Sequence, residues 1–310
     1  MGGEGKLTNL PVIDFTKQDL KPGTESWQST CQSVRQALEE HGCFVAVFHK
    51  FASHELRNGL FGSIKELFDL PDETKFRNKY EGVPLKGYVG QNPKIPLHES
   101  FGIDHGTSPE GIESFADRLW TQGNDQFCKY VVEYAKVAEE LDRMVARMIF
   151  ESYNMAVCYE PYIKQTSYLL RLLQHKGSEE EDHPKQAFVT HTDKSFTTIL
   201  HQNEVNALEV ETKDGQWIKV DFSSPTSFVV MAGDALTVWT NDRVQAPRHK
   251  VVMTGKETRY SLGLFTFIKG TVHVAASLID EQNPPKYKPF EHQELLKFSY
   301  SANIKDYCGV

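Results

Sequence analysis

The sequence predicts an α+β protein with a mainly β core, in which helices of the N-terminal half pack on a sandwich or barrel of strands, such as a jelly roll. Two patterns predict this fold class. Apolar residues recur at helical spacing in several segments before residue 153, and from about residue 165 onward short β-like runs alternate with turns. Because no flexible linker separates the halves, we expect residues 1–160 and 161–310 to form one compact unit.

The N-terminal region is expected to begin with a strand and a helix. Residues 10–15 form a short apolar run that predicts a strand. Residues 26–41 predict a helix, with Ser26 as its N-cap and Gly42 directly after its end. The apolar run of residues 43–48 then predicts a buried strand.

Two more helices and a long irregular stretch are expected before residue 160. Ser53 caps the first of these helices, which ends at Leu70-Pro71 because proline disfavours helical geometry in the residue before it. Residues 80–118 contain many glycines and prolines, and their apolar residues favour an ordered covering loop over a free linker. Residues 125–153 keep the i, i+3, i+4 rhythm throughout and predict a core-facing scaffold helix rather than a cofactor or partner groove.

The C-terminal half, residues 161–310, is expected to supply the strands of the core. Asp214-Gly215 provides the tight turn of a hairpin that spans residues 206–220. The other β-like runs are residues 168–173, 195–200, 228–231, 236–239, 250–253 and 260–268. Strands at such near-regular spacing are typical of a sandwich or barrel.

Composition narrows the class of function. The 310-residue chain has a net charge of −8, which disfavours nucleic-acid binding because a polyanion needs a basic surface. The five cysteines include no Cys-x-x-Cys pair, so we expect reduced thiols rather than disulfides or a thiolate zinc site. The sequence has no long apolar run and no signal-type N-terminus. We therefore expect a cytoplasmic protein that binds a small molecule, with no membrane segment and no obligate protein partner.

The strongest chemical signal is the segment His191-Thr192-Asp193. In an extended chain residues two apart point to the same face, so His191 and Asp193 can bind one metal ion. A lone His-x-Asp pair is weak evidence, because a surface histidine near a turn aspartate is more common. His249, at the start of a later β run, supplies a third ligand. Two imidazoles and one carboxylate leave positions open and suit a non-haem Fe(II) centre that binds a co-substrate and O₂.

A second signal lies ten positions after His249. Alternation points Arg259 and Ser261 to one face of a predicted strand, together with Phe265 and Phe267. An arginine aimed into an apolar interior is costly unless it meets an anion. A guanidinium with a neighbouring hydroxyl suits a carboxylate ligand, and an internal salt bridge to an Asp or Glu is the alternative.

The order and spacing of these motifs resemble those of plant 2-oxoglutarate and Fe(II)-dependent dioxygenases. The shared pattern is His-x-Asp, a distal His about 55 residues later and Arg-x-Ser ten residues beyond that His. The resemblance covers nearly the whole chain, including the N-terminal motif Glu40-His41-Gly42-Cys43-Phe44. Met231-Ala232-Gly233-Asp234 and the ending Tyr307-Cys308-Gly309-Val310 are most similar to the subgroup named for alkenyl- and hydroxyalkyl-producing enzymes of glucosinolate metabolism.

This resemblance implies a fold, an activity and a set of ligands. The fold would be a double-stranded β-helix, the jelly roll of cupin-like proteins, and the protein would be an oxidoreductase. His191, Asp193 and His249 would hold Fe(II), and 2-oxoglutarate would place its far carboxylate on Arg259 and Ser261. O₂ would be the second co-substrate, and succinate and CO₂ would be released.

Some positions depart from the family pattern. The family often has an Asn and a Tyr where this chain has Leu173 and His175. His175 is expected to donate a hydrogen bond to the 2-oxoglutarate carboxylate instead, and a surface position is the alternative if the strand register is off by one. Phe196, Phe265 and Phe267 are candidates for an aromatic substrate wall, and core packing is the alternative for each.

Three interpretations of the chain follow. The first is an active oxygenase that oxidises a small plant specialised metabolite by hydroxylation, desaturation or O-demethylation. The second is a catalytically silent relative that binds a small molecule or a partner protein, and the third is a zinc hydrolase with the same ligands. The complete metal motif and the Arg259-x-Ser261 pair favour the first, whereas a hydrolase would need a general base that the motif lacks.

Overall fold

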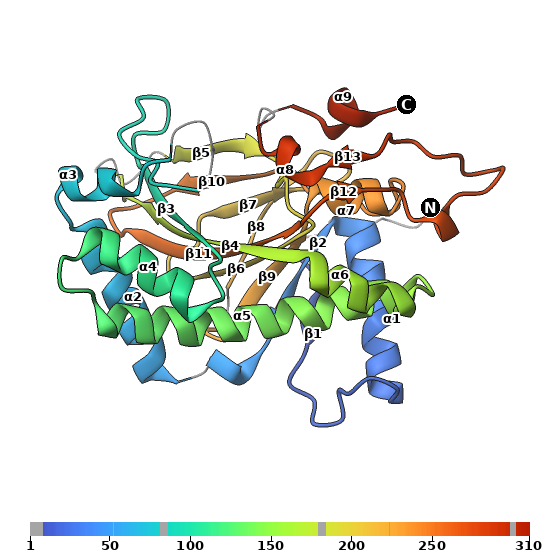
Figure 1. Cartoon of the computed structure of the whole chain (residues 1–310), viewed down its shortest axis with the longest axis horizontal. Helices are drawn as coiled ribbons and strands as arrows, with labels where there is room; N and C mark the ends of the chain where they lie inside the picture. The colour runs from blue at the N-terminus through green and yellow to red at the C-terminus, as the bar shows by residue number, and fades with distance from the viewer. Residues whose placement is uncertain (1–8, 52, 81–85, 179–183, 223, 298–301) are drawn as a thin grey trace, which may run out of the picture.

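The computed structural model describes residues 9–51, 53–80, 86–178, 184–222, 224–297 and 302–310. In this structure two β-sheets face each other, and helices cover the outer face of the larger sheet (Figure 1). Two packed, largely antiparallel sheets are the architecture of a jelly roll, so the predicted fold class is confirmed.

Within the described residues, the larger sheet has seven strands and the smaller sheet has four. The larger sheet contains, in spatial order, β1 (Val12–Asp14), β2 (Cys43–Val47), β9 (Ser227–Ala232), β6 (Thr197–Gln202), β11 (Arg259–Ile268), β4 (Thr166–His175) and β3 (His98–Asp104). The smaller sheet contains β5 (Lys185–His191), β10 (His249–Met253), β7 (Leu208–Glu211) and β8 (Trp217–Lys219). A short pair, β12 (Thr271–Val272) and β13 (Phe290–Glu291), completes the described strands. All described pairs are antiparallel except β1 with β2.

The space between the two sheets is apolar in one part and polar in another. One hydrophobic cluster joins Val229 and Met231 of β9 to Leu208 and Val210 of β7. Along β6, alternation points every second residue into the same space: Leu200 joins this cluster, whereas Thr198 and Gln202 are polar. The polar part lies between β6, β11, β4 and β3 of the larger sheet and β5 and β10 of the smaller one, and it holds the candidate site.

Helices cover the outer face of the larger sheet. The described helices are α1 (Glu25–His41), α2 (His54–Phe68), α3 (Asp72–Lys75), α4 (Pro109–Leu119), α5 (Asp125–Ser152), α6 (Tyr159–Gln165), α7 (Asp234–Trp239), α8 (His292–Leu295) and α9 (Ile304–Cys308), with short 3-10 turns η1 (His49–Phe51), η2 (Phe76–Asn78), η3 (Ala156–Cys158) and η4 (Ala276–Leu278). The predicted scaffold helix is α5, which runs along the sheet in Figure 1. Its apolar stripe is buried because α1, α2, α4 and the sheet all pack against it.

The helix ends follow the predicted capping chemistry in two cases out of three. Ser53 caps α2, and Gly42 ends α1 in a left-handed conformation with φ of 70°. The N-cap of α1 is Thr24, two residues before the predicted Ser26, and the helix begins at Glu25. The Thr24 hydroxyl accepts the Trp27 N–H at 3.2 Å, and Ser26 lies inside the first turn.

Two predicted segments are wrong. Residues 80–118, predicted as an irregular covering loop, contain strand β3 and helix α4, while residues 81–85 lie outside the described part of the chain. Two of the residues that suggested a loop lie in regular structure: Pro109 is at the start of α4, and Gly102 pairs with Arg171. Residues 236–239, predicted as a strand, belong to α7, since a short, fully buried apolar run fits either structure.

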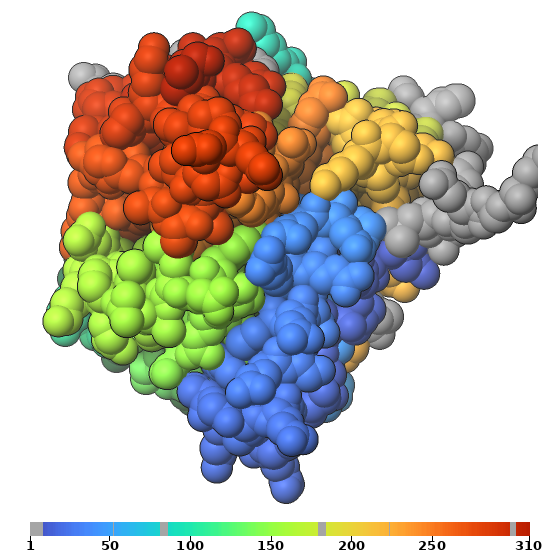
Figure 2. All heavy atoms as spheres, turned by 90° about the vertical axis from the view of Figure 1, so that its right-hand side faces the viewer, coloured from blue at the N-terminus to red at the C-terminus, as the bar shows by residue number. Residues whose placement is uncertain are grey.

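One face of the molecule brings α1 close to the C-terminal part of the chain. Figure 2 shows the blue N-terminal segment meeting orange and yellow segments at its upper edge, while a yellow-green segment lies below the red and orange C-terminal segment. The interior supports this arrangement, because one continuous hydrophobic cluster includes Val34 of α1, Val145 of α5, Leu264 of β11 and Ile304 of α9. None of the described helices combines the length and apolar composition needed to cross a bilayer.

Candidate metal and co-substrate site

The structure brings the three predicted metal ligands together. His191 ends β5, Asp193 follows in the next turn, and His249 begins β10 directly opposite His191. One ligand atom from each residue lies within 4.8 Å of the others. The Nε2 atoms of the two histidines are each 3.7 Å from Oδ1 of Asp193.

The hydrogen bonds of the two histidines leave their Nε2 lone pairs facing Asp193. His191 Nδ1 is 2.9 Å from the Val189 carbonyl, and His249 Nδ1 is 3.1 Å from the Pro247 carbonyl. A carbonyl can only accept, so each Nδ1 carries the proton and each Nε2 is the ring atom that can bind a metal. Burial, with a smaller effect of nearby His249, lowers the pKa of His191 to about 4, which keeps its imidazole neutral at physiological pH.

Asp193 is held so that one oxygen faces the histidines. Its Oδ2 accepts a hydrogen bond of 2.7 Å from the Thr198 hydroxyl, which leaves Oδ1 toward the two Nε2 atoms. Its carbonyl accepts the Asp234 N–H at 2.8 Å, and the buried Lys194–Asp234 ion pair of 2.6 Å ties α7 to the same turn. Two neutral nitrogen donors and one carboxylate on one side of a point fit Fe(II) with open positions.

Arg259 lies on the inner face of β11 and is 2% exposed. Its Nε donates to Oε1 of Gln202 at 2.9 Å, and its Nη1 donates to the Ser261 hydroxyl at 2.8 Å. Burial lowers the pKa of Arg259 to about 10, so the guanidinium is still charged at neutral pH. The alternative of an internal salt bridge is not found, because no Asp or Glu of the described residues pairs with Arg259. A buried cation without a carboxylate partner favours an anionic ligand.

His175 is beside Arg259, as predicted, but its ring nitrogens face protein atoms. Its Nδ1 is 3.4 Å from Arg259 Nη1, and its Nε2 is 3.0 Å from Nδ1 of His98. Both ring nitrogens of His175 therefore have protein partners, so neither is left for the expected direct hydrogen bond to 2-oxoglutarate. Leu173, two residues earlier, shares the inner face and pairs with Ser261.

The three candidate substrate residues have different surroundings. Phe196 is fully buried among Phe150, Tyr162 and Trp239, with ring centroids 4.9 to 6.3 Å away, and this placement corrects the expectation of a substrate wall there. Core packing describes Phe196 because its side chain fills the interface between α5, α6 and α7.

Phe267 and Phe265 lie at the far end of β11. Phe267 is buried with Leu169 and Leu296, so it too packs against protein. Phe265 is half-buried and pairs across the strands with Thr198, the residue whose hydroxyl binds Asp193. A substrate role therefore stays a prediction for Phe265.

Sequence reasoning missed the residues that hold the ligands in place. Thr198 and Gln202 both point inward from β6, but a polar residue in a strand carries no signal until its neighbours are known. His98 lies in β3, which was not predicted, so the pairing of β3 with β4 was invisible. Phe188 packs against both His98 and His191, at ring-centroid distances of 4.6 and 4.9 Å.

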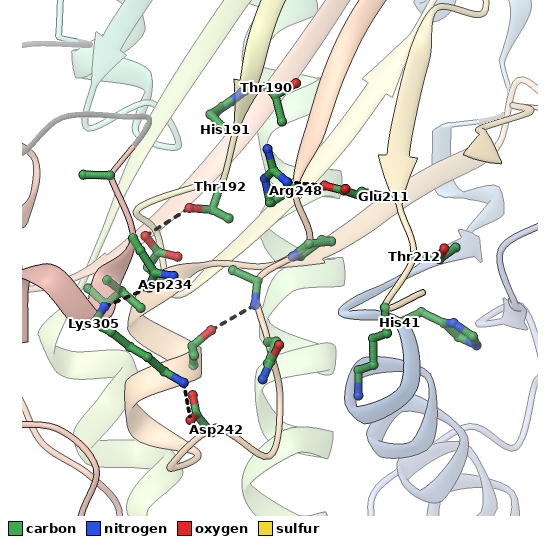
Figure 3. A pocket seen from close by; sticks show the side chains of 18 of the residues that line it. His41, Thr190, His191, Thr192, Glu211, Thr212, Asp234, Asp242, Arg248 and Lys305 are labelled. Carbon is green, nitrogen blue, oxygen red and sulfur yellow. Dashed lines mark hydrogen bonds and ion pairs between the residues drawn. The ribbon is translucent and has the colours of Figure 1, made fainter. Parts of the chain in front are cut away.

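A groove of about 630 Å³ borders the metal ligands from another side (Figure 3). It reaches His191 through Thr190 and Thr192, which alternation points away from Asp193. Residues that line the groove form ion pairs with one another, for example Arg248 with Glu211 at 2.7 Å. Of the three metal ligands only His191 lines this groove.

Comparison with known proteins identifies the class. Residues 155–268 match the model of the 2OG-Fe(II) oxygenase superfamily, and residues 10–121 match the N-terminal model described as non-haem dioxygenase in morphine synthesis. The chain belongs to the 2OG-Fe(II) oxygenase superfamily. It is a 2-oxoglutarate-dependent dioxygenase, with Fe(II) as its metal and 2-oxoglutarate and O₂ as co-substrates.

Relatives place the chain more narrowly. A probable 2-oxoglutarate-dependent dioxygenase of Arabidopsis thaliana, AOP1.2, is 41% identical over 296 residues, which cover 93% of this chain and 90% of the relative. A probable inactive dioxygenase of the same plant, AOP2, is 29% identical, over 97% of this chain and 98% of its own. Among solved structures, the complex of 2-oxoglutarate with the Arabidopsis dioxygenase for auxin oxidation 1 has a TM-score of 0.78 and 27% identity, over 89% of this chain and 99% of that one. The resemblance seen in the sequence is confirmed.

Proposed function

We propose that His191, Asp193 and His249 hold Fe(II), and that Arg259 and Ser261 bind the far carboxylate of 2-oxoglutarate. The observation that carries this proposal is the buried Arg259, which has no carboxylate partner among the described residues and lies on the same inner face as Thr198, the support of Asp193. When both are bound, the chemistry available is oxidation of a substrate C–H bond with release of succinate and CO₂.

In this proposal each protein group has a defined part. The carbonyls of Val189 and Pro247 hold His191 and His249 in the tautomer that binds a metal through Nε2. Thr198 orients Asp193, and Gln202 fixes the Nε side of the Arg259 guanidinium. The other side of that guanidinium remains for a carboxylate, which it can bind with charge-assisted hydrogen bonds.

We further propose that the substrate is a small plant specialised metabolite and that the enzyme acts in the cytoplasm. The substrate proposal is supported by two solved neighbours, 26% and 27% identical, whose names describe dioxygenases for auxin oxidation. Hydroxylation, desaturation and O-demethylation all begin at the same metal centre, so the reaction outcome depends on the substrate. Phe265 is the candidate for contact with it.

The first test is anaerobic addition of Fe(II) and then 2-oxoglutarate to the metal-free protein. We expect a weak visible absorption band from the chelate in wild type and its loss in Asp193→Ala. The control is Asp214→Ala, in the exposed turn between β7 and β8, which should keep the band. If folded wild-type protein gives no band, the proposed ligand set is refuted.

The second test separates an active enzyme from a silent relative. Succinate release is measured with a panel of plant metabolites under O₂. Substrate-dependent succinate supports an oxygenase. A protein that binds Fe(II) and 2-oxoglutarate but releases no succinate with any metabolite would favour the silent alternative. One relative of the chain is itself named as a probable inactive dioxygenase.

A further inference from the structure

Three buried residues form a row across the inner face of the larger sheet. The register places His98 of β3 opposite His175 of β4, and His175 opposite Arg259 of β11. Consecutive members are joined: His98 Nδ1 is 3.0 Å from His175 Nε2, and His175 Nδ1 is 3.4 Å from Arg259 Nη1. The three residues are 1% to 2% exposed.

The row continues beyond His98. Nε2 of His98 is 3.0 Å from the Ser100 hydroxyl, which also accepts a hydrogen bond from the guanidinium of Arg171. Phe188 packs against the His98 ring and separates it from His191. The row therefore has an arginine at each end and two imidazoles in the middle.

Both imidazoles are neutral. Burial, and then the positive charge of Arg171, lowers the pKa of His98 to about 3. Burial and the neighbouring His98 lower the pKa of His175 well below its ordinary value. A charged imidazole here would face a guanidinium in a low-dielectric interior, which is unfavourable.

The direction of every hydrogen bond in the row follows from Arg259. A guanidinium only donates, so Nδ1 of His175 is the acceptor and the single ring proton lies on Nε2. That proton makes Nδ1 of His98 the acceptor, and it places the His98 proton on Nε2, toward Ser100. His98 and His175 thus carry their protons on the nitrogen opposite to the one used by His191 and His249.

We propose that His98 is a positioning residue for 2-oxoglutarate binding, which acts by holding His175 as a hydrogen-bond acceptor for Arg259. This proposal rests on the proposed function of Arg259. With Nη1 engaged by His175 and Ser261 and Nε by Gln202, no hydrogen bond of Arg259 to a described residue uses Nη2. The row therefore turns Nη2 toward the co-substrate, although His98 itself never touches it.

Without His98 the hydrogen-bond directions of His175 and Arg259 are no longer fixed. The Nε2 proton of His175 would have no acceptor in a buried site, so the ring would favour the other tautomer, whose Nδ1–H points at the Arg259 guanidinium. Arg259 would then shift away from the geometry that offers Nη2. The expected consequence is weaker binding of 2-oxoglutarate, with the metal ligands unchanged.

The kinetic test compares three variants with wild type. His98→Leu should raise the KM for 2-oxoglutarate about tenfold, the effect of losing one hydrogen bond to a charged group, with kcat changed less than twofold. His98→Asn places an amide oxygen where Nδ1 lies, keeps the acceptor for His175 and should stay within about threefold of the wild-type KM. His201→Leu is the control, because His201 is equally buried and contacts Arg57, but on the helix-covered face of the sheet.

An unchanged KM in His98→Leu would overturn the inference, and so would an equal rise in His201→Leu, because either result means that His98 only supports the fold. In both cases the proposed function would stand. If wild type itself binds no 2-oxoglutarate, the proposed function fails and the inference fails with it. Anaerobic titration of 2-oxoglutarate into the Fe(II) protein gives the same comparison without turnover.

A direct readout needs neither turnover nor co-substrate. Ring ¹⁵N spectra of the metal-free protein, assigned with His98→Asn, should show the protons of His98 and His175 on Nε2. A proton on Nδ1 of either residue would overturn the inference even where the kinetic variants do not fold.

Discussion

Thr198→Val tests how far the metal centre depends on a residue that cannot bind metal. The Thr198 hydroxyl donates to Oδ2 of Asp193 at 2.7 Å and also contacts the Ser195 hydroxyl at 2.8 Å. Valine has nearly the same shape as threonine, so the change removes the hydrogen bond without leaving a cavity. Asp193 then keeps its charge but loses the partner that directs Oδ1 toward His191 and His249.

The size of the effect follows from that one bond. A hydrogen bond to a charged group contributes about 1.5–3 kcal/mol, and loss of an outer partner of a metal ligand costs roughly 10- to 100-fold in metal affinity. A 10- to 100-fold change corresponds to about 1.4–2.8 kcal/mol, so the two estimates agree. We expect the dissociation constant for Fe(II) to rise by that factor in Thr198→Val.

The assay is anaerobic calorimetric titration of Fe(II) into the metal-free protein. Thr197→Val is the matched control, because the neighbouring Thr197 hydroxyl donates to Asp142 at 2.5 Å on the opposite face of the same strand. Both variants should lose stability, but only Thr198→Val should lose metal affinity. If Thr198→Val binds Fe(II) as tightly as wild type, Thr198 does not orient Asp193 and the described support of the site is wrong.

Three further predictions concern other parts of the molecule. Arg259→Ala should weaken 2-oxoglutarate binding by about 2–5 kcal/mol, measured as KM, and an unchanged KM would exclude its role. Phe196→Ala should cost about 3–5 kcal/mol of stability by denaturant unfolding, while a normal stability with an altered substrate KM would restore it as a substrate residue. Burial raises the pKa of Asp142 from 3.8 to about 6, so the folded protein retains a proton that the unfolded chain releases, and the free energy of unfolding should fall by about 2 kcal/mol between pH 4 and pH 6. In Asp142→Asn that contribution should disappear, and an identical pH dependence in both proteins would contradict the assigned pKa.

Most residues of the site could be predicted because they form pairs two residues apart in the sequence. His191 and Asp193 are two residues apart, so strand alternation alone places them on one side. Arg259 and Ser261 follow the same rule in a strand that the sequence marks clearly. For each of these two pairs the sequence is sufficient because the geometry lies within one short segment, whereas His249 lies on another strand, β10, and its prediction depended on the spacing of the motifs.

The supporting residues could not be predicted because their geometry lies between strands. Whether Thr198 meets Asp193, or Gln202 meets Arg259, depends on which strands pair and in which register. His98 is the extreme case, since its strand runs through a segment rich in glycine and proline. The helix α7 was mistaken for a strand for a different reason: it is buried on all sides, so no hydrophobic periodicity distinguishes the two.

Gly233, the N-cap of α7, affects the position of Asp193 because α7 packs against the turn that holds Asp193. A β-carbon on Gly233 would lie 1.9 Å from the Ser195 carbonyl oxygen, a distance that no side chain can occupy. Even alanine at this position would push the turn, and Asp193 with it, away from the histidines. Substitutions of Gly233 should therefore inactivate the enzyme as substitutions of the iron ligands do, although glycine has no side chain with which to bind iron.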